Sequence, residues 1–310
     1  NKIICDFNAD EPFLNQQDQL EIYDYQEISK IAIETLNKRS KVNQKKDFIN
    51  LFLKLTSHKI NSKNIGDELP ENYRDIIEYS INAGIFDFIF NNYENQNYNS
   101  KYEKKSYLPS EMLFILGQEP YSDDPYTKRI LSIMKNFIDD KKNCIFNLRN
   151  SNNKDKIITN FSDLNINFQD TSDIKNSSSD YKKLSSALEK NYFNKKNIYS
   201  AWIDGSLAAC EQKIINNDIF WIWDAGEFYS QKLNGKDLSS LDLSDSKSID
   251  LSSILGSLWF EIDKIMASYA DIIIVNSQEN KQYLINKFGL ENNKIICDFN
   301  ADEPFLNQQD

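Results

Sequence analysis

The sequence predicts an α/β protein, in which a small helical region precedes a Rossmann-like domain built on a parallel sheet. After Pro109, short apolar runs alternate with amphipathic helical patterns, which is typical of βαβ units. Between Leu20 and Tyr98, apolar residues recur only at helical spacing. The expected divisions are a duplicated segment (1–19), a helical region with linker (20–108), the Rossmann-like domain (109–300) and a closing stretch of the duplicated segment (301–310).

The helical region carries three apolar patterns, the last of which begins near Pro70 and runs past Phe88. Proline suits the first turn of a helix, and Gly84 is expected to break or bend this one. The aromatic run IFDFIF (85–90) is interpreted as a buried helix face and not as a binding surface, because that spacing is what a buried helix needs. The Asn- and Tyr-rich stretch 91–107 is expected to be a linker.

The α/β region alternates strand-like and helix-like segments in order. Strands are expected at 112–117, 144–149, 197–204, 219–227, 271–276 and 294–299, with 157–161 as a further candidate. Helices are expected at 128–139, 177–193, 205–216, over the apolar face from Ile254 to Tyr269, and at 278–288. Ser277 is the predicted N-cap of the last helix and Gly289 its C-terminal stop.

A repeated segment frames the chain, because Asn1–Asp18 is identical to Asn293–Asp310. The chain is either a slice of a long-period tandem array, or its ends were joined or duplicated during assembly of the gene. Both copies contain the strand-like KIICDF, but one sheet has a single place for that strand. We therefore expect one copy to be loose or to pair outside the domain.

Composition excludes several classes of protein. A net charge of −11 argues against a nucleic-acid partner, since such binding depends on clustered Lys and Arg. The sequence contains no long apolar run and no signal-like start, so neither a membrane span nor secretion is predicted. A cytoplasmic location is therefore expected, and peripheral association with a membrane is left open. One histidine, His58, excludes a His-based zinc cluster and a Ser-His-Asp triad. The four cysteines lack CxxC spacing and are expected to be buried, reduced thiols.

Polar residues follow the predicted strands, where ligands bind in open parallel sheets. The candidates are Gln118, Glu119, Tyr126 and Arg129 after the first strand, then Asp204, then Asp224 with Glu227, and finally Asn276 with Ser277. Each of them taken alone is also explained as a helix cap or loop residue, and the predicted cap fully explains Ser277.

Asp224 and Glu227 form the sharpest pair, because two carboxylates after a Trp-rich buried strand could have raised pKa values and serve as a base or bind hydroxyl groups. Alternatively, one caps a helix and the other is solvated. Arg129 could pair with a phosphate, with one of these acids, or in a surface salt bridge. The loop GQEPYSDDP (117–125) has one glycine, so no dinucleotide fingerprint is present.

Three segments together resemble one known family. The closing run SYADIIIVNSQENKQYLINKFGLENNKIICDFN (268–300) resembles the end of the N-terminal domain in GT-B glycosyltransferases of the glycogen-synthase-like superfamily. IFWIWDAGEFYS (219–230) is similar to the "YDAHE" segment of a bacterial subset, and SDDPYTKRILSIMKNF (122–137) to the first loop and its Arg-bearing helix. The resemblance covers roughly 111–300.

The resemblance implies an acceptor-side domain, with a sugar or glycan acceptor as partner. It implies that Asp224 and Glu227 are catalytic and face a cleft, beside Arg129 and the 118–126 loop, and that Asn300 begins a hinge. The nucleotide sugar would be a co-substrate held by a donor domain in cis or in trans, and no cofactor would be bound tightly. Two departures stand out: Gly226 replaces the family's histidine, and the region before Pro109 has no donor-domain features. The chain by itself is therefore expected to be inactive as a transferase.

Two other interpretations remain open. The second interpretation is a non-catalytic binding or scaffold unit of a repeat-bearing protein, which Gly226 and the lack of donor features favour. An enzyme of another class on the same sheet is the third, because fold alone does not fix function.

Overall fold

The computed structural model describes residues 79–80, 83–92, 112–120, 125–136, 142–148, 166–174, 179–192, 196–237, 240 and 251–298. The chain divides into two compact units, of which the first comprises 1–94, 176–179 and 229–263 and the second 95–175, 180–228 and 264–310. The linker predicted at 91–107 is wrong at its start, because Asn91 and Asn92 belong to the helix Ile85–Asn92, and its other residues lie outside the described ranges. The candidate strand at 157–161, His58 and the N-terminal copy of the repeat also lie outside them.

The second unit contains a parallel sheet, which confirms the predicted Rossmann-like α/β class. Among the described residues the sheet has seven strands in the order β3-β2-β1-β4-β5-β6-β7, and every neighbouring pair is parallel. The strands are β1 (Leu113–Leu116), β2 (Lys142–Phe146), β3 (Ile166–Asp170), β4 (Asn197–Ala201), β5 (Phe220–Ala225), β6 (Ile272–Val275) and β7 (Ile295–Cys297). The first six of these positions reproduce the doubly wound order, in which the direction of winding reverses between β1 and β4.

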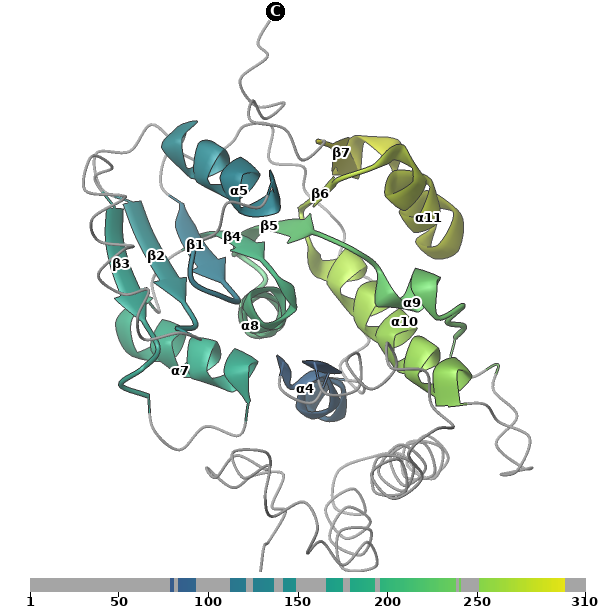
Figure 1. The fold of residues 1–310 in the computed structure, drawn as a ribbon, viewed down its shortest axis with the longest axis horizontal. Coiled ribbons are helices and arrows are strands. Elements are labelled where there is room, and N and C mark those ends of the chain that lie inside the picture. Colours follow the sequence, from purple (N-terminus) through teal and green to yellow (C-terminus); the bar gives the residue numbers. More distant parts are fainter. Residues whose placement is uncertain are drawn as a thin grey trace, which may run out of the picture. The chain divides into compact units, whose positions relative to one another are not determined.

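Helices cover both faces of this sheet (Figure 1). They are α5 (Pro125–Asn136), α7 (Asp180–Tyr192), α8 (Ile203–Ile215) and α11 (Gln278–Phe288), and a short 3-10 turn, η5 (Asn292–Lys294), precedes β7. In Figure 1, α5 lies on one side of β1 and β4 while α7 and α8 lie on the other. Ser277 caps α11 through its hydroxyl, and Gly289 ends the helix at φ 65°, so both predictions are confirmed.

The core between α5 and the sheet follows the two-residue period of the strands. Alternate strand residues point to the same face, so each strand presents a row of side chains to α5. This core contains Phe114, Leu116, Cys144, Phe146, Tyr199, Ala201, Phe220, Ile222 and Ile274, packed with Ile130, Ile133 and Met134 of α5. Continuing the same alternation places Asp224 after Ile222 and Asp298 after Ile296 on the α5 face of the sheet.

Six of the predicted strands are confirmed, with ends shifted by a few residues. The strand predicted at 197–204 stops at Ala201, because α8 already begins at Ile203. The edge strand β3 was not predicted. Its sequence INFQD has only two apolar residues and is nowhere fully buried, so it lacks the apolar run that marks the other strands.

The first unit contains α4 (Ile85–Asn92), α9 (Tyr229–Lys232) and most of α10 (Leu251–Tyr269), whose last six residues belong to the second unit. Gly84 has φ 85° immediately before α4, which confirms the predicted break. In α4, Ile85, Phe88 and Ile89 are fully buried, as predicted for a core face. Trp259 of α10 donates from Nε1 to the Ser80 hydroxyl at 3.0 Å.

Candidate functional site

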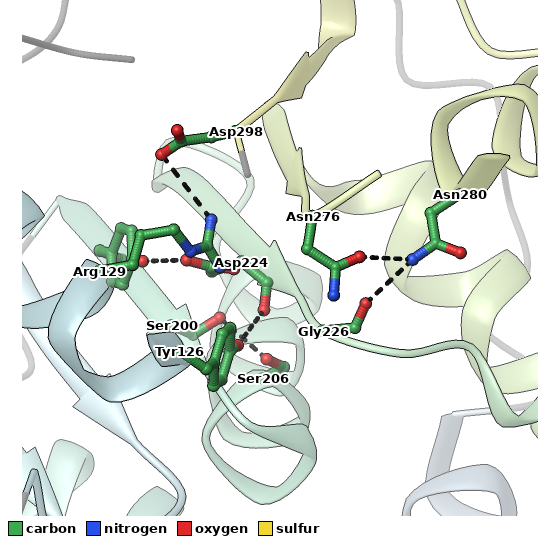
Figure 2. Close-up of polar contacts among 10 residues, drawn as sticks. Tyr126, Arg129, Ser200, Ser206, Asp224, Gly226, Asn276, Asn280 and Asp298 are labelled. Atoms are coloured by element: carbon green, nitrogen blue, oxygen red, sulfur yellow. Dashed lines mark hydrogen bonds and ion pairs between the residues drawn. The ribbon is translucent and has the colours of Figure 1, made fainter. Parts of the chain in front are cut away.

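The carboxyl ends of the strands bring polar side chains to one edge of the sheet. Figure 2 shows residues from the ends of β5, β6 and β7 at this edge, together with Tyr126 and Arg129 of α5. The backbone ladder extends past the strand ends here, because Gly117 donates to the carbonyl of Ala201 at 3.1 Å and Asp298 to that of Val275 at 2.8 Å. The polar groups are therefore held on a rigid frame.

Arg129 and Asp224 form a buried ion pair at the centre of this edge. Nη2 of Arg129 lies 2.5 Å from Oδ1 of Asp224, and neither side chain is exposed. The hydroxyl of Tyr199, from β4, donates to the other carboxylate oxygen of Asp224. Both oxygens of Asp224 are thus engaged, and Arg129 pairs with an acid, which was one of the three alternatives left open by the sequence.

Tyr126 fixes Arg129 from the same helix. Its hydroxyl donates to the main-chain oxygen of Asp224 at 3.2 Å, and its ring centroid lies 5.1 Å from the guanidinium carbon of Arg129. Tyr126 and Arg129 are three residues apart on α5 and therefore face the sheet together. Burial alone would lower the pKa of Arg129, but Asp224, Tyr199 and Tyr126 raise it, so the guanidinium remains charged. Burial, followed by the charge of Asp224, raises the pKa of Tyr199, which keeps its hydroxyl a donor.

A second acid approaches the same guanidinium. Oδ2 of Asp298 lies 3.9 Å from Nη1 of Arg129, and Asp298 is itself buried. Within the described part of the chain, Nε and Nη1 of Arg129 have no hydrogen-bond partner. Arg129 thus connects the ends of β5 and β7 but keeps two donors without a hydrogen bond.

Asp204 belongs to a separate buried network beyond β1, β2 and β3. Asn147 donates to Oδ2 of Asp204 at 2.7 Å, and the Thr171 hydroxyl donates to Oδ1 of Asn147 at 2.7 Å. A Cβ placed on Gly117 would lie 1.9 Å from Oδ1 of Asp204, so only glycine permits this approach. The carboxylate of Asp204 therefore occupies the space where the first strand ends, next to the reversal of winding.

The turn between β4 and α8 has an unusual backbone. Trp202 precedes the first residue of α8 with φ 56° and ψ 158°, a region that residues other than glycine rarely adopt. Its ring packs edge-on against Tyr126, with centroids 5.3 Å apart. Strained backbone of this kind concentrates at functional sites, and here it lies at the point where the winding reverses.

The segment after β5 is tied to the start of α11 (Figure 2). The side-chain nitrogen of Asn280 donates to the Gly226 carbonyl at 3.3 Å and to Oδ1 of Asn276 at 2.7 Å. Ser277 accepts from the backbone of Asn280 at 3.1 Å, so its hydroxyl serves the helix cap. Glu227, which follows Gly226 in the sequence, is exposed. The structure thus separates the predicted acid pair into a buried Asp224 and an exposed Glu227.

The remaining candidates lie in the loop after β1, where Gln118 is half-buried and Glu119 is buried. Of the predicted residues, the structure brings Tyr126, Arg129 and Asp224 into direct contact, while Asp204 and Asn276 belong to neighbouring networks. Sequence reasoning missed five polar residues of this edge: Tyr199, Asp298, Asn147, Thr171 and Asn280. Two of them carried a signal, because the two-residue period places Tyr199 and Asp298 on the face of Asp224.

Among the described residues, no cluster of His, Cys, Asp and Glu could hold a metal ion. Cys144 and Cys210 are free, buried thiols, as predicted, whereas Cys297 is free but only partly buried, because β7 is the last described strand of the sheet. Burial raises the pKa of all three thiols. No helix in the described ranges is both long and apolar enough to span a membrane.

The fold and the edge residues define a Rossmann-like α/β domain with a buried Arg-Asp-Tyr cluster at the carboxyl ends of its strands. No protein-family model matches the chain, and a comparison with curated proteins likewise finds no match. The function must therefore be argued from this edge of the sheet.

Proposed function

We propose that the second unit is the acceptor-side domain of a nucleotide-sugar-dependent glycosyltransferase of the GT-B type. One observation carries the proposal: the three segments that resemble this family meet at a single side chain. Arg129 comes from the first, Asp224 from the second and Asp298 from the third, and the guanidinium lies 2.5 Å from one acid and 3.9 Å from the other. Asp224 and Asp298, which lie 95 and 169 positions after Arg129 in the sequence, thus both approach its guanidinium.

The two acids after β5 would have different roles. Asp224 has both oxygens engaged and is buried, so it positions Arg129 and Tyr199 and is not available as a base. Glu227 is exposed, and an exposed carboxylate can accept the proton or the hydrogen bond of a sugar hydroxyl. We assign acceptor recognition to Glu227, with Gln118 and the half-buried Tyr126 beside the same edge.

The charges at this edge favour a neutral, hydroxyl-rich ligand over a phosphate. The start of α8, where a phosphate would otherwise bind, already holds the carboxylate of Asp204 in the first helical turn. The negative charge of Asp204 would repel a nucleotide phosphate at the start of α8, so phosphate binding is disfavoured there. The nucleotide sugar would then be bound by a donor domain in cis or in trans.

Calorimetric titration of the full chain would test the proposal. The ligands are a panel of neutral oligosaccharides and, separately, UDP-glucose and GDP-mannose. We expect at least one oligosaccharide to bind and neither nucleotide sugar to bind. Glu227→Gln should weaken oligosaccharide binding about tenfold or more, which corresponds to losing a charged hydrogen bond. Glu189→Gln, at an exposed position of α7, is the matched control and should leave binding unchanged.

A non-catalytic binding or scaffold unit is the second candidate, favoured by Gly226. The family that the chain resembles has a histidine at this position, whereas here no side chain is present. Among the described residues, the atoms nearest to a Cβ on Gly226 would be Cζ and the hydroxyl oxygen of Tyr126, each at 3.8 Å, so space exists for a side chain. If this candidate is correct, no oligosaccharide will bind and Glu227→Gln will change nothing. Tight binding of UDP-glucose would contradict both candidates.

A further inference from the structure

The strained turn at Trp202 is held in place from both sides. The carbonyl of Ala201 accepts from the backbone N–H of Gly117 at 3.1 Å, and the carbonyl of Trp202 accepts from that of Ser206 at 2.9 Å. Backbone in this region costs stability and persists only where its surroundings enforce it. A glycine would adopt the same φ without strain, so the turn alone does not explain a bulky indole at this position.

Trp202 also differs from the other tryptophans in its exposure. Its side chain is only half-buried. The other three are almost fully enclosed, because Trp221, Trp223 and Trp259 are at most 4% exposed. The ring of Trp202 packs edge-on with that of Tyr126, which is half-buried as well. Two aromatic rings thus share one partly exposed position at the carboxyl ends of the strands.

The Tyr126 ring has open space on the side of Gly226 (Figure 2). Its hydroxyl donates to the main-chain oxygen of Asp224 at 3.2 Å, which fixes the ring. Among the described residues, the atoms nearest to a Cβ on Gly226 would be two Tyr126 atoms, each at 3.8 Å. Residue 226 has no side chain to fill that space, and the exposed Glu227 follows it in the sequence.

The chemistry of this surface fits an uncharged sugar ring. The C–H face of a pyranose is apolar and is favourably removed from water by an aromatic ring, whereas its hydroxyls need hydrogen-bond partners beside that ring. The exposed carboxylate of Glu227 can accept from such a hydroxyl. The buried cluster behind the rings has one base, Arg129, and two acids, so it does not attract an anionic ligand.

We infer that the pair formed by Trp202 and Tyr126 is a stacking site for one pyranose ring of the acceptor. Trp202 contacts the C–H face of this ring, while Glu227 binds one of its hydroxyls. The strain at Trp202 is the cost of holding the indole at this edge. The inference rests on the proposed acceptor-binding function and adds to it the residue that recognises the ring.

Four variants of the full chain test the inference by calorimetry, with the oligosaccharide that binds the unchanged protein. Trp202→Ala should weaken binding about tenfold or more, because the apolar contact is lost. Trp202→Phe keeps an aromatic ring and should bind within about threefold of the unchanged protein. The control is Ile215→Ala, at the 65% exposed end of the same helix, which should leave binding unchanged.

Trp202→Gly separates loss of binding from loss of folding. Glycine relieves the strain, so this variant should melt at the same temperature as Trp202→Ala or a few degrees higher. It should nevertheless bind the oligosaccharide as weakly as Trp202→Ala does. If Trp202→Gly or Trp202→Ala binds as tightly as the unchanged protein, the inference is overturned.

Acrylamide quenching of tryptophan fluorescence shows directly where the ligand lies, because Trp202 is more exposed than the other three. The oligosaccharide should reduce quenching in the unchanged protein and have no effect in Trp202→Phe. Equal protection by adenosine, an uncharged ligand with a flat ring, would overturn the inference in favour of a nucleobase site.

The outcomes also separate this inference from the proposed function. If an oligosaccharide binds and Glu227→Gln weakens its binding, but quenching of Trp202 does not change, this inference alone fails. If no oligosaccharide binds, the proposed function and the stacking site fail together.

Discussion

The guanidinium of Arg129 donates to Oδ1 of Asp224 at 2.5 Å while neither side chain reaches solvent. This contact joins α5 to β5 across the face of the sheet. A buried ion pair gains little net stability, because both charges lose their hydration, but removing one partner leaves the other buried without compensation. The pair therefore determines the position of α5 on the sheet but contributes little to the net free energy of folding.

Arg129→Leu is expected to destabilise the protein by about 3–5 kcal/mol, because Asp224 remains buried without its cation. Urea unfolding monitored by circular dichroism measures the loss. The double variant Arg129→Leu/Asp224→Leu should recover part of it, since no isolated charge remains. The control is Lys183→Ala, which breaks the partly exposed pair with Asp180 and should cost under about 0.5 kcal/mol. Equal losses for Arg129→Leu and Lys183→Ala would contradict the importance of the buried pair.

Gly205→Ala and Gly226→Ala are expected to differ sharply. A Cβ on Gly205 would lie 2.7 Å from the Ile115 carbonyl oxygen and 2.9 Å from the Gly117 nitrogen, which are backbone atoms of the sheet edge. Relieving that overlap requires α8 to move away from β1, at a cost of about 1–3 kcal/mol. At Gly226 the nearest atoms are 3.8 Å away, so the free energy of unfolding should change by under about 0.5 kcal/mol. Urea midpoints that fall equally for both variants would show that the packing of α8 on β1 is looser than described.

Ser277→Ala should weaken α11 by about 1 kcal/mol, because the hydroxyl accepts the backbone N–H of Asn280 at 3.1 Å. Ser277→Asp keeps an acceptor and should retain the stability of the unchanged protein. Hydrogen exchange of the α11 amides measures the effect locally. If Ser277→Ala and Ser277→Asp exchange at the same rate, the cap contributes nothing to this helix.

Most of the sheet could be predicted from the sequence because its central strands are buried on both faces. Runs such as LFIL in β1 and IIIV in β6 are too short for a buried helix, so they indicate strands once polar loops flank them. β3 was not predicted because it is not buried on both faces. An end strand such as INFQD is half-exposed, so its residues need not be apolar, and only its pairing with β2 identifies it.

The candidate site was predictable in its location but not in its contacts. Parallel strands all end at one edge, so polar residues after them must meet there, and this logic found Arg129 and Asp224. It could not choose between a phosphate and an acid as the partner of Arg129, because that choice depends on a residue 95 positions away. Tyr199 lies inside a predicted strand and not after it, so this logic does not include it, and only the structure shows its hydroxyl reaching Asp224.

The first unit is expected to lose stability as the pH rises, because of Asp263. Burial raises the pKa of this carboxyl to about 8, and the hydrogen bond from Ser230 offsets only part of that effect. In the unfolded chain an aspartate titrates near a pKa of about 3.9. The protonated carboxyl therefore stabilises the folded state fully below about pH 4, and that stabilisation is lost between about pH 4 and pH 8. The slope is at most about 1.4 kcal/mol per pH unit for one group. Urea unfolding at several pH values measures it.

Asp263→Asn is the matched control for this pH dependence. An asparagine accepts the hydrogen bond from Ser230 but does not titrate, so the variant should lose the slope between pH 4 and pH 8 that Asp263 supplies. At pH 8 it should be more stable than the unchanged protein, because the unfolded chain no longer gains from ionising this group. If both proteins show the same dependence on pH, Asp263 is ionised in the folded state and its burial is compensated by contacts other than Ser230.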